Sequence, residues 1–104
     1  MLDLIRNILG TPDDRLVDGA TAHDLVAKGA TLLDVRTPQE FANGSVAKAK
    51  NIPIQALQNR LDEIDKEHPV VVFCRSGGRS ATAAGVLAAS GFRVFDAGGI
   101  GRLT

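Results

Sequence analysis

The sequence predicts a three-layer α/β domain in which helices flank both faces of a mainly parallel central β-sheet. A chain of 104 residues is a common size for one domain and too short for two useful cores. Its hydrophobic residues, 44% of the total, include four Phe but no Trp or Tyr, so the core must be aliphatic, which suits layered α/β packing. Short apolar runs alternate with stretches of helical periodicity, which indicates crossover connections between parallel strands.

Residues 1–12 are predicted to form an amphipathic arm before a single domain over residues 13–104. Apolar residues of the arm recur near helical spacing and stop at Gly10 and Pro12. We expect the arm to pack on the domain, with docking to a membrane or a partner as the alternative. The chain shows no signal-peptide pattern and no run near the roughly 20 apolar residues that span a bilayer. We therefore expect a cytoplasmic protein without a membrane partner.

The domain is predicted to begin with a strand, a helix and a second strand. A short strand over Arg15–Val17 precedes a helix that starts with a capping-box pattern at Thr21, where Asp24 takes the acidic position, and that ends at Gly29. The apolar run Thr31–Val35 lies between turn signals, which is typical of a buried parallel strand.

The middle of the chain is predicted to contain two helices around a short strand. Thr37 and Pro38 fit the start of a helix that ends at Asn43 and Gly44. Irregular chain and a short strand follow over 45–52. A second helix is then expected to present four apolar residues on one face: Ile54, Leu57, Leu61 and Ile64.

The strongest strand signal is the apolar and β-branched run Val70–Phe73, as expected of a central strand that is covered on both faces. An Ala-rich helix is predicted over Ser80–Ser90, and Gly91 ends it. The last predicted strand is Phe92–Phe95. The sequence therefore predicts a strand, a Gly-rich loop and a helix around residue 74.

Cys74, the only cysteine of the chain, follows the predicted central strand directly. Ligands of open α/β sheets bind beyond the carboxyl ends of the strands, so this position favours function over packing. A single cysteine cannot form an internal disulfide, and no Cys/His cluster could close a zinc site. Cys74 is therefore either a small buried hydrophobe or a reactive thiol.

The loop after Cys74 has the composition of an anion-binding site. Its two glycines let successive backbone N–H groups point inward, and the following helix directs its positive end at the same place. Two arginines beside a Gly pair are poor packing material, although solvated surface charge is their alternative role. We expect a thiolate with a lowered pKa at Cys74 as the catalytic group. The predicted substrate-binding residues are Arg75, Ser76, Gly77, Gly78 and Arg79.

The chain resembles the single-domain kind of rhodanese family over nearly everything from Leu16 to Ile100. The matching landmarks occur in the family's order: Asp34-Val-Arg36, Glu40-Phe41, Gly44, Asn51-Ile-Pro53, Cys74 to Ser80, Gly91-Phe92 and Gly98-Gly-Ile100. The resemblance implies a parallel sheet with helices on both faces. Two departures fall in one loop, where Ser45-Val46 replaces the usual His-Ile and Lys48 replaces a Gly.

The resemblance also implies a function. Cys74 would take the outer sulfur of a small anionic donor such as thiosulfate and pass it from a persulfide to a thiophilic acceptor: cyanide, glutathione, thioredoxin or a protein thiol. Arg75 and Arg79 would hold the donor's charge, and no metal or organic cofactor would be needed. Twelve basic residues balance twelve acidic ones, so no overall field favours nucleic acid as a partner.

Two alternatives remain open at this level. A non-catalytic binding module or persulfide carrier would share the same residues. A phosphatase or arsenate reductase is disfavoured because Cys74 and Arg79 enclose four residues, whereas the related phosphatases generally enclose five. The shorter loop suits the smaller sulfur of a persulfide.

Three charged residues near the predicted strand end at Val35 are expected to be scaffold rather than catalyst. Arg36 and Glu40 are expected to pair with each other, and Asp34 to bond to nearby backbone groups. Gly98-Gly99 is expected to form a tight turn beside the active loop.

Overall fold

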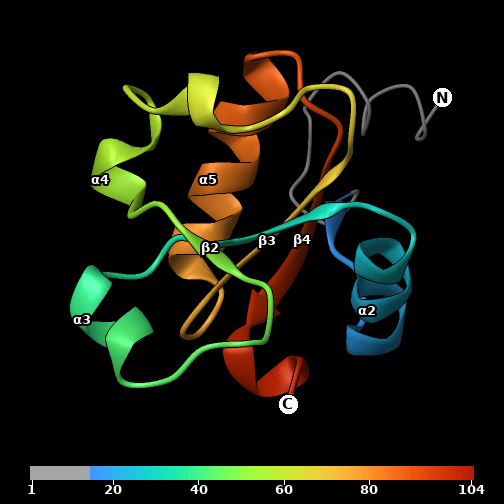
Figure 1. Ribbon diagram of the computed structural model, residues 1–104, viewed down its shortest axis with the longest axis vertical. Coiled ribbons are helices and arrows are strands. Elements are labelled where there is room, and N and C mark those ends of the chain that lie inside the picture. The colour runs from blue at the N-terminus through green and yellow to red at the C-terminus, as the bar shows by residue number, and fades with distance from the viewer. Residues whose placement is uncertain (1–14) are drawn as a thin grey trace, which may run out of the picture.

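Four parallel strands form the centre of the computed structural model, which describes residues 15–104 (Figure 1). The strands are β1 (Thr31–Asp34), β2 (Lys50–Asn51), β3 (Val70–Cys74) and β4 (Val94–Gly99). Their order in the sheet is β2-β1-β3-β4, and every pairing is parallel. The predicted arm and the first two residues of the predicted domain lie outside the described residues.

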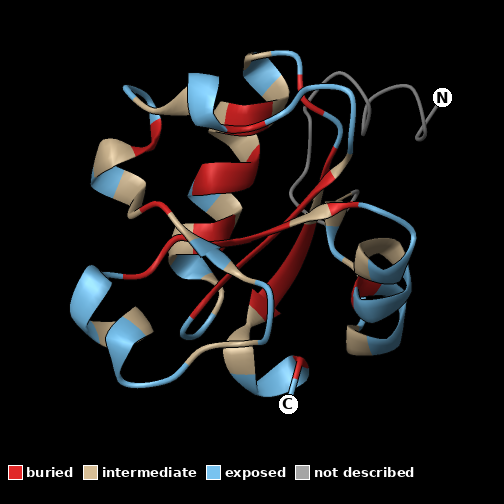
Figure 2. Cartoon of the chain, in the orientation of Figure 1, coloured by how far each residue is buried: buried red, intermediate tan, exposed pale blue. Residues whose placement is uncertain are grey.

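Helices cover both faces of the sheet, which confirms the predicted three-layer α/β fold. The helix α2 (Gly19–Ala27) lies on one face, and α4 (Ile54–Leu57) and α5 (Gly78–Ala89) lie on the other (Figure 1). The strand β3 is buried along its whole length because it has a neighbour on each side and a layer on each face (Figure 2). Its residues alternate between two aliphatic clusters, with Val72 and Cys74 on the α5 side and Val71 and Phe73 on the α2 side.

The short helix α3 (Pro38–Ala42) begins as the sequence predicts. Thr37 caps it by accepting from the backbone N–H of Glu40, and Glu40 accepts from the backbone N–H of Thr37 in return. Pro38 occupies the first turn, where its missing N–H leaves no helical bond unmade. The capping box therefore fixes the position of the Glu40 side chain at the start of α3.

The first predicted strand and the predicted start of the first helix were wrong, whereas Gly29 ends that helix as predicted. The predicted strand at Arg15–Val17 is reduced to a single bridge between Leu16 and Asp96. The helix α2 begins at Gly19, since Asp18 rather than Thr21 is its cap: the Asp18 carboxylate accepts from the backbone N–H of Thr21.

Two further elements differ from the sequence prediction. The predicted helix over residues 54–64 is two separate turns, α4 and the 3₁₀ helix η2 (Leu61–Glu63), held by i→i+3 bonds such as Arg60 N–H to Leu57 O. Leu57 and Ile64 are still buried, so the apolar spacing was satisfied without a continuous helix. The last strand runs to Gly99 rather than Phe95, because pairing with β3 overrides the weak strand propensity of its final residues.

A buried ion pair fastens the end of β1. Asp34 is fully buried, and its two carboxylate oxygens accept from the guanidinium of Arg36 at 2.8–3.1 Å. Arg36 also donates to the carbonyl of Gly44, and Ser45 donates to Asp34 at 2.8 Å. The expected pairing of Arg36 with Glu40 was therefore wrong: Asp34 supplies the carboxylate, and Ser45 adds the hydrogen bond that closes the loop.

Lys48 is the only non-glycine residue among 15–104 with a positive φ, at 72°. A left-handed conformation costs a residue with a Cβ about 1 kcal/mol, and Lys48 is exposed, so no burial of its side chain offsets this cost. We expect Lys48→Gly to raise the free energy of unfolding by about that amount. The measurement is urea denaturation followed by circular dichroism.

The neighbouring Ala47→Gly is the matched control for this substitution. Ala47 is also exposed but has no positive φ. Glycine at this position should therefore lower the free energy of unfolding of the protein by roughly 0.5–1 kcal/mol, through the conformational entropy of the unfolded chain alone. Equal effects of the two substitutions would show that the strain at Lys48 has no energetic weight.

Candidate active site

The loop between β3 and α5 forms the candidate site. Cys74 is the last residue of β3, and α5 begins four residues later at Gly78. Gly77 caps the helix with φ 112°, a conformation that a residue with a Cβ rarely adopts. The reversal turns the first N–H groups of α5 back toward the end of β3, as an anion cradle requires.

The Cys74 thiol is buried and hydrogen-bonded. The residue is 1% exposed, and its Sγ accepts from the backbone N–H of Gly77 at 3.0 Å. Burial is the largest single influence and raises the pKa of the thiol. Hydrogen bonds from the Ser80 hydroxyl and from the backbone N–H groups of Ser80, Gly77 and Ser76 outweigh it together, so the pKa of Cys74 lies below the ordinary thiol value. The loop thus stabilises the thiolate form of Cys74 more than water stabilises that of an ordinary thiol.

Ser80 is the site residue that sequence reasoning missed. It is fully buried in the first turn of α5, and its Oγ donates to the carbonyl of Gly77 at 3.1 Å. The same hydroxyl lowers the pKa of the Cys74 thiol. It has one rotatable proton, which can turn from the Gly77 carbonyl to the sulfur when the thiol ionises, because the charged sulfur is the stronger acceptor. The signal in the sequence was its position directly after Arg79, at the helix end that faces the thiol.

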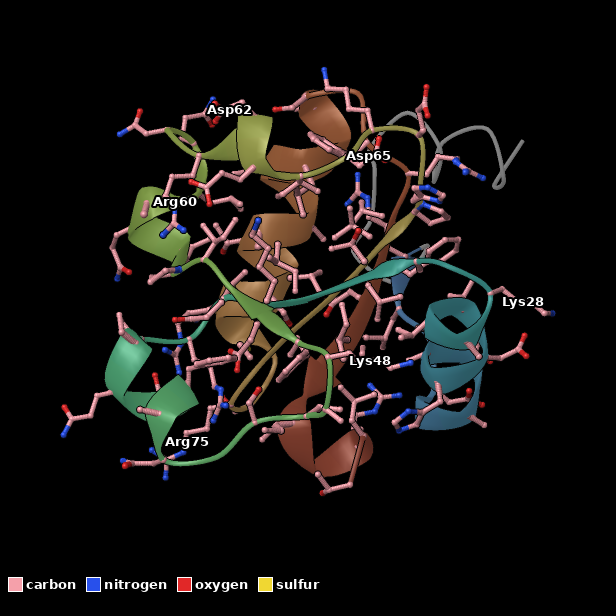
Figure 3. All side chains as sticks on the ribbon, viewed as in Figure 1. Lys28, Lys48, Arg60, Asp62, Asp65 and Arg75 are labelled. Carbon is pink, nitrogen blue, oxygen red and sulfur yellow. The ribbon has the colours of Figure 1, made fainter. Side chains whose placement is uncertain are left out.

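The two arginines of the loop have different surroundings. Arg79 forms a two-point ion pair with Glu40 of α3, at 2.6 Å and 3.0 Å. The bond from Arg79, together with the backbone N–H of Thr37, lowers the pKa of Glu40 to about 2. Arg75 is exposed and, within residues 15–104, its side chain makes no hydrogen bond or ion pair; Figure 3 shows it at the edge of the molecule beside α3. Of the two predicted substrate-binding arginines, Arg75 is therefore the one without a partner among residues 15–104.

The end of β4 lies against the loop. A bulge between Val72 and Phe73 shifts the pairing, so that Gly99 of β4 lies opposite Cys74. A Cβ on Gly99 would come within 2.7 Å of the Arg75 carbonyl oxygen, closer than real Cβ contacts. The predicted tight turn at Gly98-Gly99 is instead a bulged strand end, and glycine is needed there because two backbones meet.

This arrangement supports nucleophilic chemistry by a sulfur anion. The buried Cys74 sulfur has backbone N–H donors that would stabilise a thiolate, and the exposed guanidinium of Arg75 lies in the same loop. In the part of the chain that the structure describes, no three His, Cys, Asp or Glu side chains gather as metal ligands would. No helix within the described residues is long and apolar enough to cross a membrane.

Comparisons with known proteins point to one family. The model of the rhodanese-like domain matches residues 15–100. A protein named thiosulfate sulfurtransferase GlpE from Stutzerimonas stutzeri is 31% identical over 80 residues, which cover 77% of this chain and 73% of the relative. A sulfurtransferase from Allochromatium vinosum is 41% identical over 61 residues, or 59% of this chain.

Solved structures agree with the fold. A rhodanese-related protein from Thermoplasma volcanium has a TM-score of 0.78 at 34% identity and covers 86% of this chain and 89% of its own. The human single-domain sulfurtransferase has a TM-score of 0.72 at 26% identity, with 86% and 93% covered. Among the curated relatives, the chain spans 57% of the Allochromatium protein and 49% of a Bacillus subtilis protein, about half of their lengths.

Gly99→Ala tests the close approach of β4 to the loop. The new methyl group must displace the Arg75 carbonyl, which we expect to lower stability by roughly 1–3 kcal/mol and the alkylation rate of Cys74 roughly tenfold or more. The rate is measured with iodoacetamide and intact mass. Gly85→Ala is the control: its Cβ would meet nothing within 4 Å, so stability should rise by roughly 0.5–1 kcal/mol with the rate unchanged. An unchanged rate in Gly99→Ala would contradict the steric argument.

Ser80→Ala tests the hydroxyl that faces the thiol. Loss of a donor to the thiolate should raise the pKa of Cys74, so the pH profile of iodoacetamide alkylation shifts upward and the rate at neutral pH falls roughly tenfold. Every adduct reports Cys74 because the chain has one cysteine. Ser90→Ala, which removes a hydroxyl bonded to Val86 O at the far end of α5, should leave the profile in place. A matching shift in both variants would refute a local role for Ser80.

Proposed function

Because the chain belongs to the rhodanese-like domain family, we propose that it is a sulfurtransferase that carries a sulfane sulfur as a persulfide on Cys74. The observation that carries this proposal is the buried Cys74 sulfur, which accepts from the backbone N–H of Gly77 and whose pKa is lowered by the loop. The names of its relatives, which include thiosulfate sulfurtransferases, support the same reaction class.

The first step moves sulfur onto the protein. The Cys74 thiolate attacks the outer sulfur of thiosulfate, a new S–S bond forms, and the bond to the sulfonate sulfur breaks so that sulfite leaves with the electron pair. Arg75 draws in the anionic donor, because it is exposed and has no partner among the described side chains. The negative charge then resides on the terminal sulfur of the persulfide, within reach of the loop N–H groups.

The second step regenerates the thiolate. A thiophilic acceptor, such as cyanide, glutathione, thioredoxin or a protein thiol, attacks the terminal sulfur, and Cys74 leaves as a thiolate. The hydrogen bonds that stabilise this thiolate make Cys74 a good leaving group as well as a persistent nucleophile. Neither step needs a metal or an organic cofactor, since the sulfur travels on the protein.

Sulfur loading tests this function directly. Incubation with thiosulfate should add the mass of one sulfur atom to the intact protein, and cyanide should remove it while thiocyanate forms over many turnovers. Cys74→Ser should show neither event, because serine cannot form the persulfide. Loading without repeated turnover would reduce the role to that of a persulfide carrier. No loading from thiosulfate or from a low-molecular-weight persulfide would refute the proposal, and an aryl phosphate assayed in parallel would reveal a phosphatase.

A further inference from the structure

The positive charge of the active loop is half neutralised by a neighbouring helix. Both terminal nitrogens of Arg79 bond to the carboxylate of Glu40, which projects from α3 rather than from the loop. Arg75 keeps its charge unpaired by any residue that the structure describes. A donor that approaches Cys74 therefore meets one net guanidinium charge instead of two.

The Glu40 carboxylate that neutralises Arg79 is held in place and kept ionised. One oxygen of Glu40 also accepts from the backbone N–H and the hydroxyl of Thr37, at 3.0 Å and 3.1 Å, so the capping box of α3 holds the carboxylate in place. The hydrogen bond from Arg79 is the largest of the interactions that lower the pKa of Glu40 to about 2. The carboxylate is therefore ionised at every physiological pH. Arg79 lies in the first turn of α5, directly after the cap at Gly77 whose N–H bonds to the Cys74 sulfur, and the charge of Cys74 accordingly contributes to raising the pKa of Arg79.

From this geometry we propose that Glu40 tunes the donor specificity of the site by offsetting the charge of Arg79, so that a sulfur donor with one negative charge competes better with a dianionic donor than it would in a loop with two unpaired arginines. The proposal rests on the sulfurtransferase function argued above and names the substrate class of that site. A singly charged persulfide fits this class, whereas thiosulfate carries one charge more.

The physical basis is that the Coulomb energy of a donor in the field of Glu40 scales with the donor's charge. Repulsion from one carboxylate acts twice as strongly on a dianion as on a monoanion. Methanethiosulfonate is the matched probe, because it replaces one oxyanion of thiosulfate by a methyl group. Its outer sulfur transfers to the Cys74 thiolate in the same way, with methanesulfinate leaving in place of sulfite.

The test compares both donors in Glu40→Gln. Glutamine retains a side-chain oxygen that can accept from Thr37 in the capping box, but it removes the charge beside Arg79. We expect the second-order rate of sulfur loading to rise roughly three- to tenfold for thiosulfate and by about the square root of that factor for methanethiosulfonate. The ratio of the two rates cancels any general change in the reactivity of Cys74.

Two controls separate this role from scaffolding. Glu63→Gln removes a carboxylate from a similar two-point pair with Arg60. Figure 3 shows Arg60 far from Arg75, so the ratio of the thiosulfate rate to the methanethiosulfonate rate should not change. The double substitution Glu40→Gln/Arg79→Gln removes both charges of the pair and should restore the original ratio. A thiosulfate to methanethiosulfonate ratio that falls below the original in the double variant would mean that Arg79 binds the donor despite its pairing with Glu40, which overturns the proposal.

A second readout does not depend on sulfur transfer. Iodoacetate is negative and iodoacetamide neutral, and both alkylate the single cysteine. Glu40→Gln should raise the iodoacetate to iodoacetamide rate ratio about two- to threefold, whereas unchanged or lower ratios in both assays would overturn the proposal. If the unmodified protein gains sulfur from neither donor, the sulfurtransferase function fails, and the alkylation ratio still decides whether Glu40 controls charge selection at Cys74.

Discussion

A buried sulfur anion must be surrounded by hydrogen-bond donors, and this requirement organises the carboxyl end of the sheet. Cys74 is nearly inaccessible, so water cannot satisfy a charge on its sulfur. The donors come from the reversed loop and the first turn of α5, which is possible only because Gly77 adopts a positive φ. Gly99 serves the same end from the other side, since β4 must lie against the loop backbone to close the site.

The loop separates reactivity from charge selection. Backbone N–H groups and the Ser80 hydroxyl stabilise the thiolate, and none of these donors carries a net charge. Charge is supplied by side chains at the rim, where α3 brings Glu40 to Arg79 and leaves Arg75 exposed. The groups that stabilise the sulfur and the groups that set the charge of the rim therefore lie on different elements, so substitutions in α3 can change the second without changing the first.

The sequence predicts the strand, loop and helix around Cys74 because their signals are local. A β-branched run favours a strand, an Ala-rich stretch favours a helix, and Gly77 between them permits the positive φ of the turn, so the local signals agree with one another. The 54–64 segment and the end of β4 were harder to predict, because burial and pairing with β3 decide their structure. The predicted pairing of Arg36 with Glu40 was wrong for a related reason. Asp34 and Glu40 are both near Arg36 in the sequence, and it is the burial of Asp34 in the fold that makes it the partner.

The partner of Arg79 could not be read from spacing at all, since Glu40 lies 39 residues away along the chain. Their contact requires β1 to be next to β3, so that α3 emerges beside the loop that follows β3. The buried Asp34–Arg36 pair fixes that geometry by bonding the end of β1 to Gly44 and Ser45. A scaffold network built on the end of β1 thus positions α3, and with it the Glu40 carboxylate that pairs with Arg79 of the active loop.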